Sequence, residues 1–133
     1  MHISRITLVV DDYDRAIAHY VGALGFTLLE DTPLTADKRW VVVAPSAEAP
    51  TGLLLAKAVG DRQRAAVGDQ AGGRVFLLLE TDDFAGRFKA MSDAGVSFAE
   101  APRREVYGTV AVFEDLYGNR WDLIERTAGD PKP

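Results

Sequence analysis

Residues 113–125, FEDLYGNRWDLIE, contain the pattern that decides the fold. Two apolar runs, residues 110–113 and 121–124, flank a short polar turn. The Gly118-Asn119 pair in this turn can adopt the positive φ values that a tight reversal requires. The segment therefore predicts a β-hairpin near the end of the chain.

Asp122 is the one acid inside the second apolar run. Because side chains alternate across a strand, Asp122 shares a face with Ile124, while Trp121 and Leu123 point to the other face. A strand that is apolar on both faces is covered on both, which predicts a helix behind it and a cavity in front. A buried acid needs a cation, a metal or hydrogen-bond donors. A structural carboxylate without chemical function is an equally open interpretation.

The composition restricts the class of protein. The 133 residues suffice for one domain with a core and are few for two independent ones. The net charge is -5, and the sequence has no run of basic residues that could contact successive phosphates of a nucleic acid. Nucleic acid is therefore not an expected partner. The absence of Cys excludes disulfides, thiolate metal sites and a Cys nucleophile. The first apolar run, residues 6–10, is too short for a signal peptide or a membrane span, so we predict a cytoplasmic protein without a membrane partner.

The chain repeats one order of elements in two halves. In each half an Asp-Asp pair begins an amphipathic helix and a glycine ends it, and these signals recur roughly seventy residues apart. Strands are predicted at residues 3–10, 26–29, 39–43, 53–55, 75–79 and 96–98, in addition to the hairpin. Each half alone is too small to bury both of its surfaces, so the two halves are expected to pair.

We therefore predict an α+β fold with one domain over residues 1–133. Two paired β-α-β-β-β modules, residues 1–57 and 74–126, form a curved and partly open mixed sheet around a cleft, with the helices outside. Residues 58–73 are rich in Gly, Asp, Gln and Arg, which favours a linker or a flap over the cavity. Residues 127–133 form a C-terminal tail.

The sequence resembles the vicinal oxygen chelate superfamily, which includes glyoxalase I, extradiol dioxygenases, and fosfomycin- and bleomycin-resistance proteins. The resemblance extends over residues 5–125. It is carried by LVVDD at 8–12, AIAHY at 16–20, LGF at 24–26 and FEDLYGNRWDL at 113–123. The resemblance implies paired modules, usually within a homodimer, that enclose a concave site for a small molecule.

Metal-dependent members place four ligands, mostly His and Glu, on the first and last strands of each module. The resemblance assigns these positions to Arg5, Leu55, Arg74 and Asp122. Only Asp122 has a lone pair to offer, and one carboxylate does not make a divalent site, so we predict no metal and no other cofactor. His2 has the opposite strand parity to Arg5, and His19 is expected to be a solvated helix residue.

If Arg5 and Arg74 point where metal ligands normally point, their guanidinium groups converge on Asp122. Two cations against one carboxylate leave a positive cleft that suits a carboxylate, phosphate or enolate-like ligand. A charge cluster that merely closes the cavity is the alternative. Four further residues are candidate ligand contacts, the three aromatic ones being equally compatible with ordinary core or rim positions: Thr7, Trp40, Phe76 and Tyr107.

The favoured function is metal-free binding of a small molecule, by sequestration or carriage of the bleomycin-resistance kind. The alternative is a glyoxalase-like lyase, an isomerase or a dioxygenase. Such an enzyme would act either without a metal, through Arg5, Arg74 and Asp122 as candidate catalytic residues, or with a non-standard metal site. An interaction module is a third possibility. The sequence leaves open whether the protein is an enzyme.

Overall fold

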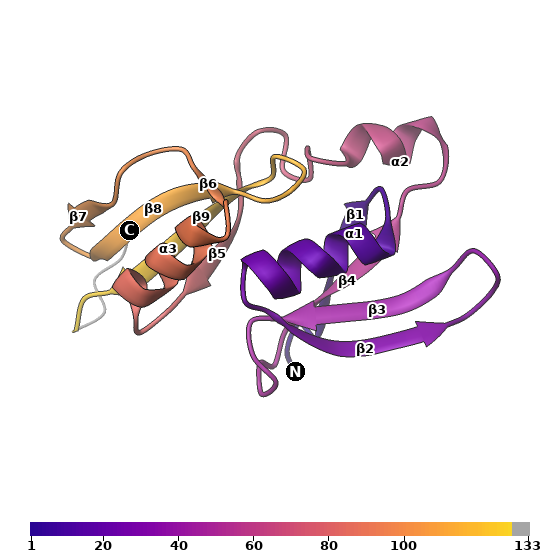
Figure 1. Ribbon diagram of the computed structural model, residues 1–133, viewed down its shortest axis with the longest axis horizontal. Helices are drawn as coiled ribbons and strands as arrows, with labels where there is room; N and C mark the ends of the chain where they lie inside the picture. Colours follow the sequence, from indigo (N-terminus) through magenta and orange to yellow (C-terminus); the bar gives the residue numbers. More distant parts are fainter. Residues whose placement is uncertain (129–133) are drawn as a thin grey trace. The chain divides into compact units, whose positions relative to one another are not determined.

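The computed structural model describes residues 1–128, which divide into two compact units (Figure 1). One unit comprises Met1–Gln70, and the other begins at Ala71. The boundary between them falls inside the segment 58–73. Of the predicted C-terminal tail, residues 129–133 lie outside the described residues.

The two units repeat one order of elements. The first contains β1 (Arg5–Val10), α1 (Tyr13–Ile17), the π-helical η1 (Ala18–Ala23), β2 (Thr27–Pro33), β3 (Arg39–Ala44), β4 (Gly52–Lys57) and α2 (Gly60–Ala66). The second contains β5 (Val75–Glu80), α3 (Phe84–Asp93), β6 (Ser97–Phe98), β7 (Arg103–Glu105), β8 (Gly108–Glu114) and β9 (Arg120–Arg126).

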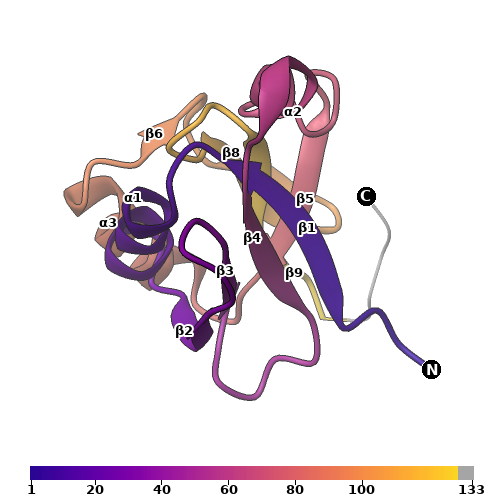
Figure 2. The same cartoon turned by 90° about the vertical axis from the view of Figure 1, so that its right-hand side faces the viewer.

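The strand orders of the two sheets correspond. The first sheet has the order β1-β4-β3-β2, and the second has β5-β9-β8-β6 with β7 also paired to β8. In both sheets the first and last strands of the unit run parallel, β1 beside β4 (Figure 2) and β5 beside β9, while the other pairs are antiparallel. The predicted α+β class with two β-α-β-β-β modules is confirmed.

The predicted hairpin is the pair β8 and β9, with Phe113 opposite Trp121. Its turn contains Gly118 at φ +95°, a left-handed conformation that glycine adopts without steric cost. The buried carboxylate of Asp115 accepts hydrogen bonds from the backbone N–H and the side-chain amide of Asn119, each at 2.9 Å. The polar residues of the turn therefore satisfy one another, as a buried turn requires.

Each long helix begins at the predicted aspartate. Asp12 accepts a hydrogen bond from Arg15 N at 2.8 Å, and Asp83 accepts one from Gly86 N at 3.1 Å. The first helix differs from the prediction because it widens after Ile17 into the π-helical η1. A glycine with positive φ follows each helix: Gly25 at 78° and Gly95 at 87°.

The core of the first unit lies between its sheet and α1, which packs on β3 and β4 (Figure 1). Register pairs Leu8 of β1 with Leu55 of β4, and Leu55 with Val41 of β3. These three side chains share one face of the sheet and are at most 1% exposed. Arg5 and Thr7 alternate with Leu8 and project from the opposite face of the sheet. We call the face turned away from α1 in the first unit, and from α3 in the second, the far face.

The core of the second unit is a series of aromatic rings between its sheet and α3. Phe113 and Trp121 stack with centroids 5.8 Å apart. Phe98 continues the series to Phe88 at 4.4 Å, and Phe88 stacks on Phe84. Trp121 therefore marks the helix face of this sheet, and its neighbour in sequence, Asp122, lies on the far face.

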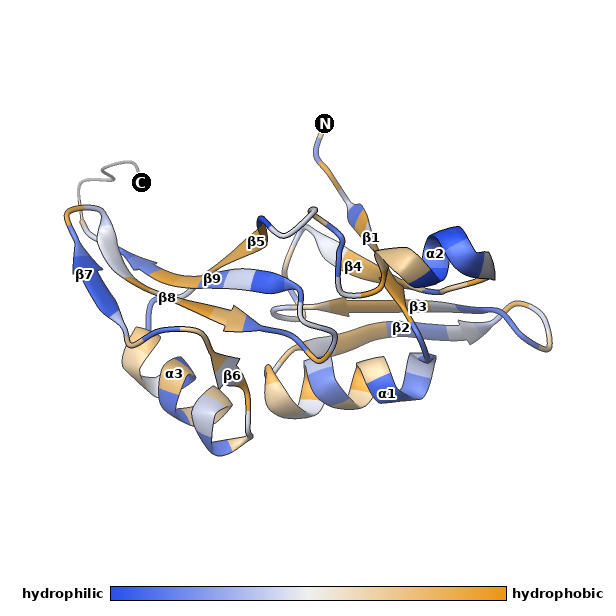
Figure 3. Cartoon of the chain, turned by 90° about the horizontal axis from the view of Figure 1, so that it is seen from above, coloured by the Kyte–Doolittle hydropathy of each residue, from blue (hydrophilic) through white to orange (hydrophobic). Residues whose placement is uncertain are grey.

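The segment predicted as a linker or flap, residues 58–73, is more ordered than the prediction. It contains α2, a seven-residue helix without buried side chains, which is hydrophilic over most of its length (Figure 3). After α2, the amide of Gln70 forms hydrogen bonds of 3.3 Å with both the N–H and the C=O of Val9 at the edge of β1. This side chain ties the segment to the sheet.

No helix among residues 1–128 has the length and apolar content needed to cross a membrane. The cytoplasmic location stays a prediction.

Candidate functional site

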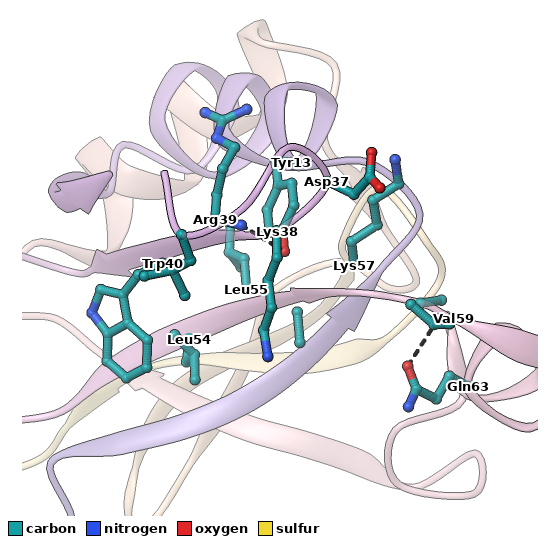
Figure 4. Close-up of a pocket in the computed structure, with 13 residues that line it drawn as sticks. Tyr13, Asp37, Lys38, Arg39, Trp40, Leu54, Leu55, Lys57, Val59 and Gln63 are labelled. Atoms are coloured by element: carbon teal, nitrogen blue, oxygen red, sulfur yellow. Dashed lines mark hydrogen bonds between the residues drawn. The ribbon is translucent and has the colours of Figure 1, made fainter. Parts of the chain in front are cut away.

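A pocket of about 560 Å³ opens in the first unit (Figure 4). Its walls come from α1, the turn between β2 and β3, the start of β3, the second half of β4, the loop after β4 and α2. Trp40 and Leu54 form one side of it, and Val59 and Gln63 the other, where Gln63 accepts a hydrogen bond of 2.9 Å from Val59 N (Figure 4). Its volume falls within the range typical of small-molecule sites.

A β-bulge in β2 supplies a carboxylate to the far face beside this pocket. Leu28 pairs with Val43 of β3, whereas Glu30 pairs with the adjacent Val42, so one residue of β2 is extra. Because of this extra residue, Glu30 shares the far face with Val42, and the following Asp31 turns to the helix face. In a regular strand Glu30 would have shared the face of Leu28.

Glu30 connects two of the predicted ligand contacts. Its Oε2 accepts a hydrogen bond from Trp40 Nε1 at 3.0 Å and a longer one from Arg5 Nη2 at 3.4 Å. The Arg5 and Glu30 side chains are 31% and 45% exposed, so the ion pair contributes little to stability. Its effect is one of position, because it fixes the edge of the Trp40 ring while leaving the residue 37% exposed.

Arg39 lies on the helix face of β3, the strand that also carries Trp40. Its guanidinium binds Asp31 through two hydrogen bonds, at 3.1 and 2.7 Å, and Asp14 of α1 at 2.8 Å. It also lies 5.2 Å from the centroid of the Tyr13 ring. The hydrogen bond to Asp31, followed by that to Asp14, raises the pKa of Arg39 above its usual value. Two carboxylates thus neutralise this cation, which holds α1 on the sheet.

Asp122 is an acid of the second sheet whose pKa departs from its ordinary value. On the far face it lies in register with Leu78 of β5 and Val112 of β8. Burial raises the pKa of the Asp122 carboxyl above its usual value; the charge of Arg103 opposes this shift, Glu100 adds to it and Arg120 opposes it. The acid is half-buried and not fully enclosed.

Arg103 is held by acids of its own unit. It binds Glu100 at 2.9 Å and Glu105 at 2.7 Å, and these hydrogen bonds raise its pKa above the usual value. Tyr107 follows in the turn between β7 and β8, is half-buried and makes a smaller contribution to the same shift. The far face of the second unit is therefore a charged surface near Asp122, in contrast to the aromatic one near Trp40.

The predicted placements of one site residue, Leu55, and of His19, which was not a site candidate, differ from the structure. The side chain of Leu55 faces α1 with Leu8, and Leu54, which pairs with Thr7, takes the far-face position; Leu55 still lines part of the pocket. His19 is half-buried with its ring 5.7 Å from that of Tyr20, and is therefore less exposed than predicted. The prediction for Leu55 was one residue out of register, because a run of three leucines carries no parity signal.

The other predicted residues are distributed over both units. Thr7 is exposed on the far face of β1, and Arg74 is exposed just before β5. Phe76 lies beside the bulge of β5 with its ring 6.2 Å from Trp121, which favours a core role. The cluster of Arg5, Arg74 and Asp122 would join the two units and stays a prediction. Glu30 was missed, because its place depends on the bulge.

The donor set does not fit the divalent ion of metal-dependent relatives. With Leu54 in place of Leu55, the positions that the resemblance assigns to metal ligands would hold two arginines, Leu54 and Asp122, and only Asp122 can donate a lone pair to a metal. Within residues 1–128, no group of three or more His, Cys, Asp or Glu side chains is arranged to hold a metal ion.

The chain belongs to the Glyoxalase/Bleomycin resistance protein/Dioxygenase superfamily, whose pattern matches residues 2–123. A protein of Shewanella frigidimarina is 52% identical over 130 residues, covering 97% of this chain and 96% of its own. The crystal structure of UcmS2 is similar with a TM-score of 0.79 and 28% identity, over 93% of this chain and 97% of that one. TnmS3, an antibiotic binding protein from Streptomyces sp. CB03234, has a TM-score of 0.76 and 30% identity, over 96% and 97% of the two chains.

Proposed function

We propose that this protein binds a small organic molecule without a metal ion, and sequesters or carries it. The observation that carries the proposal is that no group of three or more His, Cys, Asp or Glu within residues 1–128 could hold a metal ion. The donor set that the resemblance assigns supports it, because Asp122 is the single residue there that can ligate a metal. The pocket beside Trp40 supports it, since an exposed indole over apolar walls is suited to an organic ligand.

The similarity to an antibiotic binding protein supports the same proposal. TnmS3 matches this chain along almost its entire length at 30% identity. Because one fold serves many activities, the likeness by itself does not transfer a ligand. Together with the pocket and the donor set, it favours binding over catalysis.

Native mass spectrometry and metal analysis of protein purified without chelator test this function. We expect a bound organic molecule or the bare chain, and no stoichiometric Ni, Zn, Fe or Mn. Trp40→Ala should lose a co-purified molecule, whereas Val106→Ala, at a residue 81% exposed, should keep it. One tightly bound divalent ion per chain that is lost in Asp122→Ala contradicts the proposal.

A second candidate is metal-independent proton transfer through Asp122, with Arg5 and Arg74 as the predicted stabilisers of an oxyanion. The specific observation in its favour is the raised pKa of Asp122, which brings a carboxyl closer to the range useful for a general base. Incubating the protein with its co-purified molecule and following product masses tests this activity. Conversion that persists in Asp122→Asn excludes Asp122 as the base.

The quaternary structure we propose is a homodimer, following the resemblance of the two modules to those of dimeric superfamily members. Isologous dimers are the commonest closed oligomers. Light scattering at micromolar concentration should give twice the mass of the 14.5 kDa chain. A single-chain mass contradicts the dimer without affecting the proposal on binding.

A further inference from the structure

We infer that the pocket of the first unit selects a flat aromatic anion, such as an aryl carboxylate or a phenolate. Its ring would lie against Trp40 and its anionic group would meet the ammonium of Lys38. This inference rests on the proposed binding function and adds the chemical class of the ligand.

The ring of Trp40 is held in place before a ligand arrives. Its Nε1 donates to Glu30, and the bulge at residue 29 aims Glu30 at this face. An indole fixed at its N–H edge keeps a π face free for stacking, and the ordering of the ring does not have to occur on binding. The pocket therefore offers a rigid flat wall, which favours a flat ligand over a bulky aliphatic one.

Arg5 and Arg39 are each bound to an acid, whereas Lys38 is a cation beside Trp40 that has no ion pair among residues 1–128. The negative charge of Glu30 is offset by Arg5, and Arg39 is bound by two acids on the other face of β3. Lys38 lies two residues before Trp40, and its side chain runs across the pocket between Trp40 and Gln63 (Figure 4). Within residues 1–128 its ammonium takes part in none of the ion pairs.

Asp37 and Lys57 also line the pocket, and both are drawn on its side away from Trp40 (Figure 4). Lys38, whose side chain runs between Trp40 and Gln63, therefore sets the sign of the potential beside the ring. An anion is thereby favoured over a neutral or a cationic analogue of the same shape.

A titration with three probes of one shape and one aliphatic acid tests the inference. The probes are 2-naphthoate, 2-naphthalenemethanol, 2-naphthylmethylamine and cyclohexanecarboxylate, followed through the indole N–H resonance of Trp40. The chain has two tryptophans, and Trp121, which is 3% exposed, is the internal reference whose signal should stay fixed. We expect 2-naphthoate to bind about fivefold more tightly than the alcohol, the ratio that one exposed ion pair supplies. The amine and the aliphatic acid should bind more weakly than the alcohol.

Two matched variants locate the charge. Lys38→Met keeps the approximate length of the side chain and removes its charge. It should abolish the roughly fivefold preference for 2-naphthoate while leaving the affinity for 2-naphthalenemethanol unchanged. Lys57→Met should change neither affinity by more than about twofold, because Lys57 is drawn on the side of the pocket away from Trp40 (Figure 4). Glu30→Gln keeps an acceptor for Trp40 Nε1 and should retain naphthoate binding, whereas Glu30→Leu should weaken all aromatic probes together.

Three outcomes overturn the inference. The first is equal or stronger binding of the alcohol or the amine at Trp40, which leaves the proposed binding function intact. The second is a larger effect of Lys57→Met than of Lys38→Met on naphthoate, which rejects Lys38 as the anion contact. The third is no shift of the Trp40 resonance with any probe. This third outcome rejects the ligand class, and a molecule that co-purifies in that case shows that the binding function itself persists.

Discussion

In the first unit, the far face of the sheet carries Trp40, Glu30 and Arg5. In the second unit, the far face carries Asp122, whose pKa is raised by burial, lowered by the charge of Arg103 and raised by that of Glu100. The strand orders are the same, and an aspartate begins the long helix of each unit. The fold was therefore kept while the chemistry of the far face diverged. One face offers an aromatic wall and the other a half-buried acid.

The outer strands account for part of this divergence. In the first unit β2 is one strand of seven residues with a bulge, and it aims Glu30 at the far face. In the second unit the corresponding position beside β8 is divided between β6 and β7, and a loop with Pro102 separates them. Proline cannot donate to a sheet, so a continuous strand is disfavoured there. Glu100 and Arg103 at this break supply charges instead.

The largest expected effect tests whether the two cores are equivalent. Leu55→Ala in β4 and Leu123→Ala in β9 each remove a side chain that is at most 1% exposed. Each should lower the free energy of unfolding by about 2 to 5 kcal/mol, measured by urea denaturation. Leu54→Ala is the control, because Leu54 is only half-buried and on the far face. A larger loss for Leu54→Ala than for Leu55→Ala would reject the register described for β4.

Removing the capping aspartate should lower the free energy of unfolding by the same amount in both units. This loss should be smaller than that of the core substitutions. Asp12→Ala and Asp83→Ala each remove the acceptor of a backbone N–H in the first helical turn. We expect a loss of about 1 kcal/mol for each in thermal or urea unfolding. Asp12→Asn and Asp83→Asn keep a capping oxygen and should cost only a few tenths of that amount. A cost confined to one unit would show that its partner helix is held by tertiary packing alone.

Arg39 and Arg103 each bind two acids, but their replacement should lower the stability of the protein by different amounts. Arg39 is 27% exposed, binds Asp31 through two hydrogen bonds and joins β3 to α1, so Arg39→Met should cost about 1 kcal/mol. Arg103 is 43% exposed and its partners lie two and three residues away, so Arg103→Met should cost about 0.3 kcal/mol. Both losses should shrink in about 1 M salt. Equal losses would remove this contrast between the units.

The smallest effect concerns the pH dependence of Asp122. Its folded pKa is raised above the ordinary value of 3.8, so the unfolded chain releases this proton first as the pH rises. The group therefore costs no stability below pH 3.8, and the wild type loses stability as the pH rises from there through the folded pKa. Asp122→Asn should gain stability relative to the wild type between pH 3 and pH 7, as measured by urea unfolding at each pH. A relative loss over that window would mean that cations around Asp122 outweigh its burial.

The elements were predictable where a local signal fixed them. Asp12 and Asp83 begin helices because their side chains accept from nearby backbone N–H groups, and Gly118 permits the hairpin turn without steric strain. The parity of β1 was equally clear, since alternation of Arg5 and Thr7 with Leu8 permits one arrangement only. The run Leu53-Leu54-Leu55 has no alternation, and the face of each leucine there could not be predicted.

The sequence by itself determined the class of fold and the two modules, because caps, turns and alternation are local properties. Only the tertiary structure decided which side chains meet on the far face. Glu30 reaches Trp40 and Arg5 because a bulge shifts the register of β2 against β3, and register is fixed by pairing with a distant strand. The raised pKa of Asp122 has the same origin, since the burial that raises it, the charge of Arg103 that opposes the shift and the charge of Glu100 that adds to it come from residues far from Asp122 in sequence.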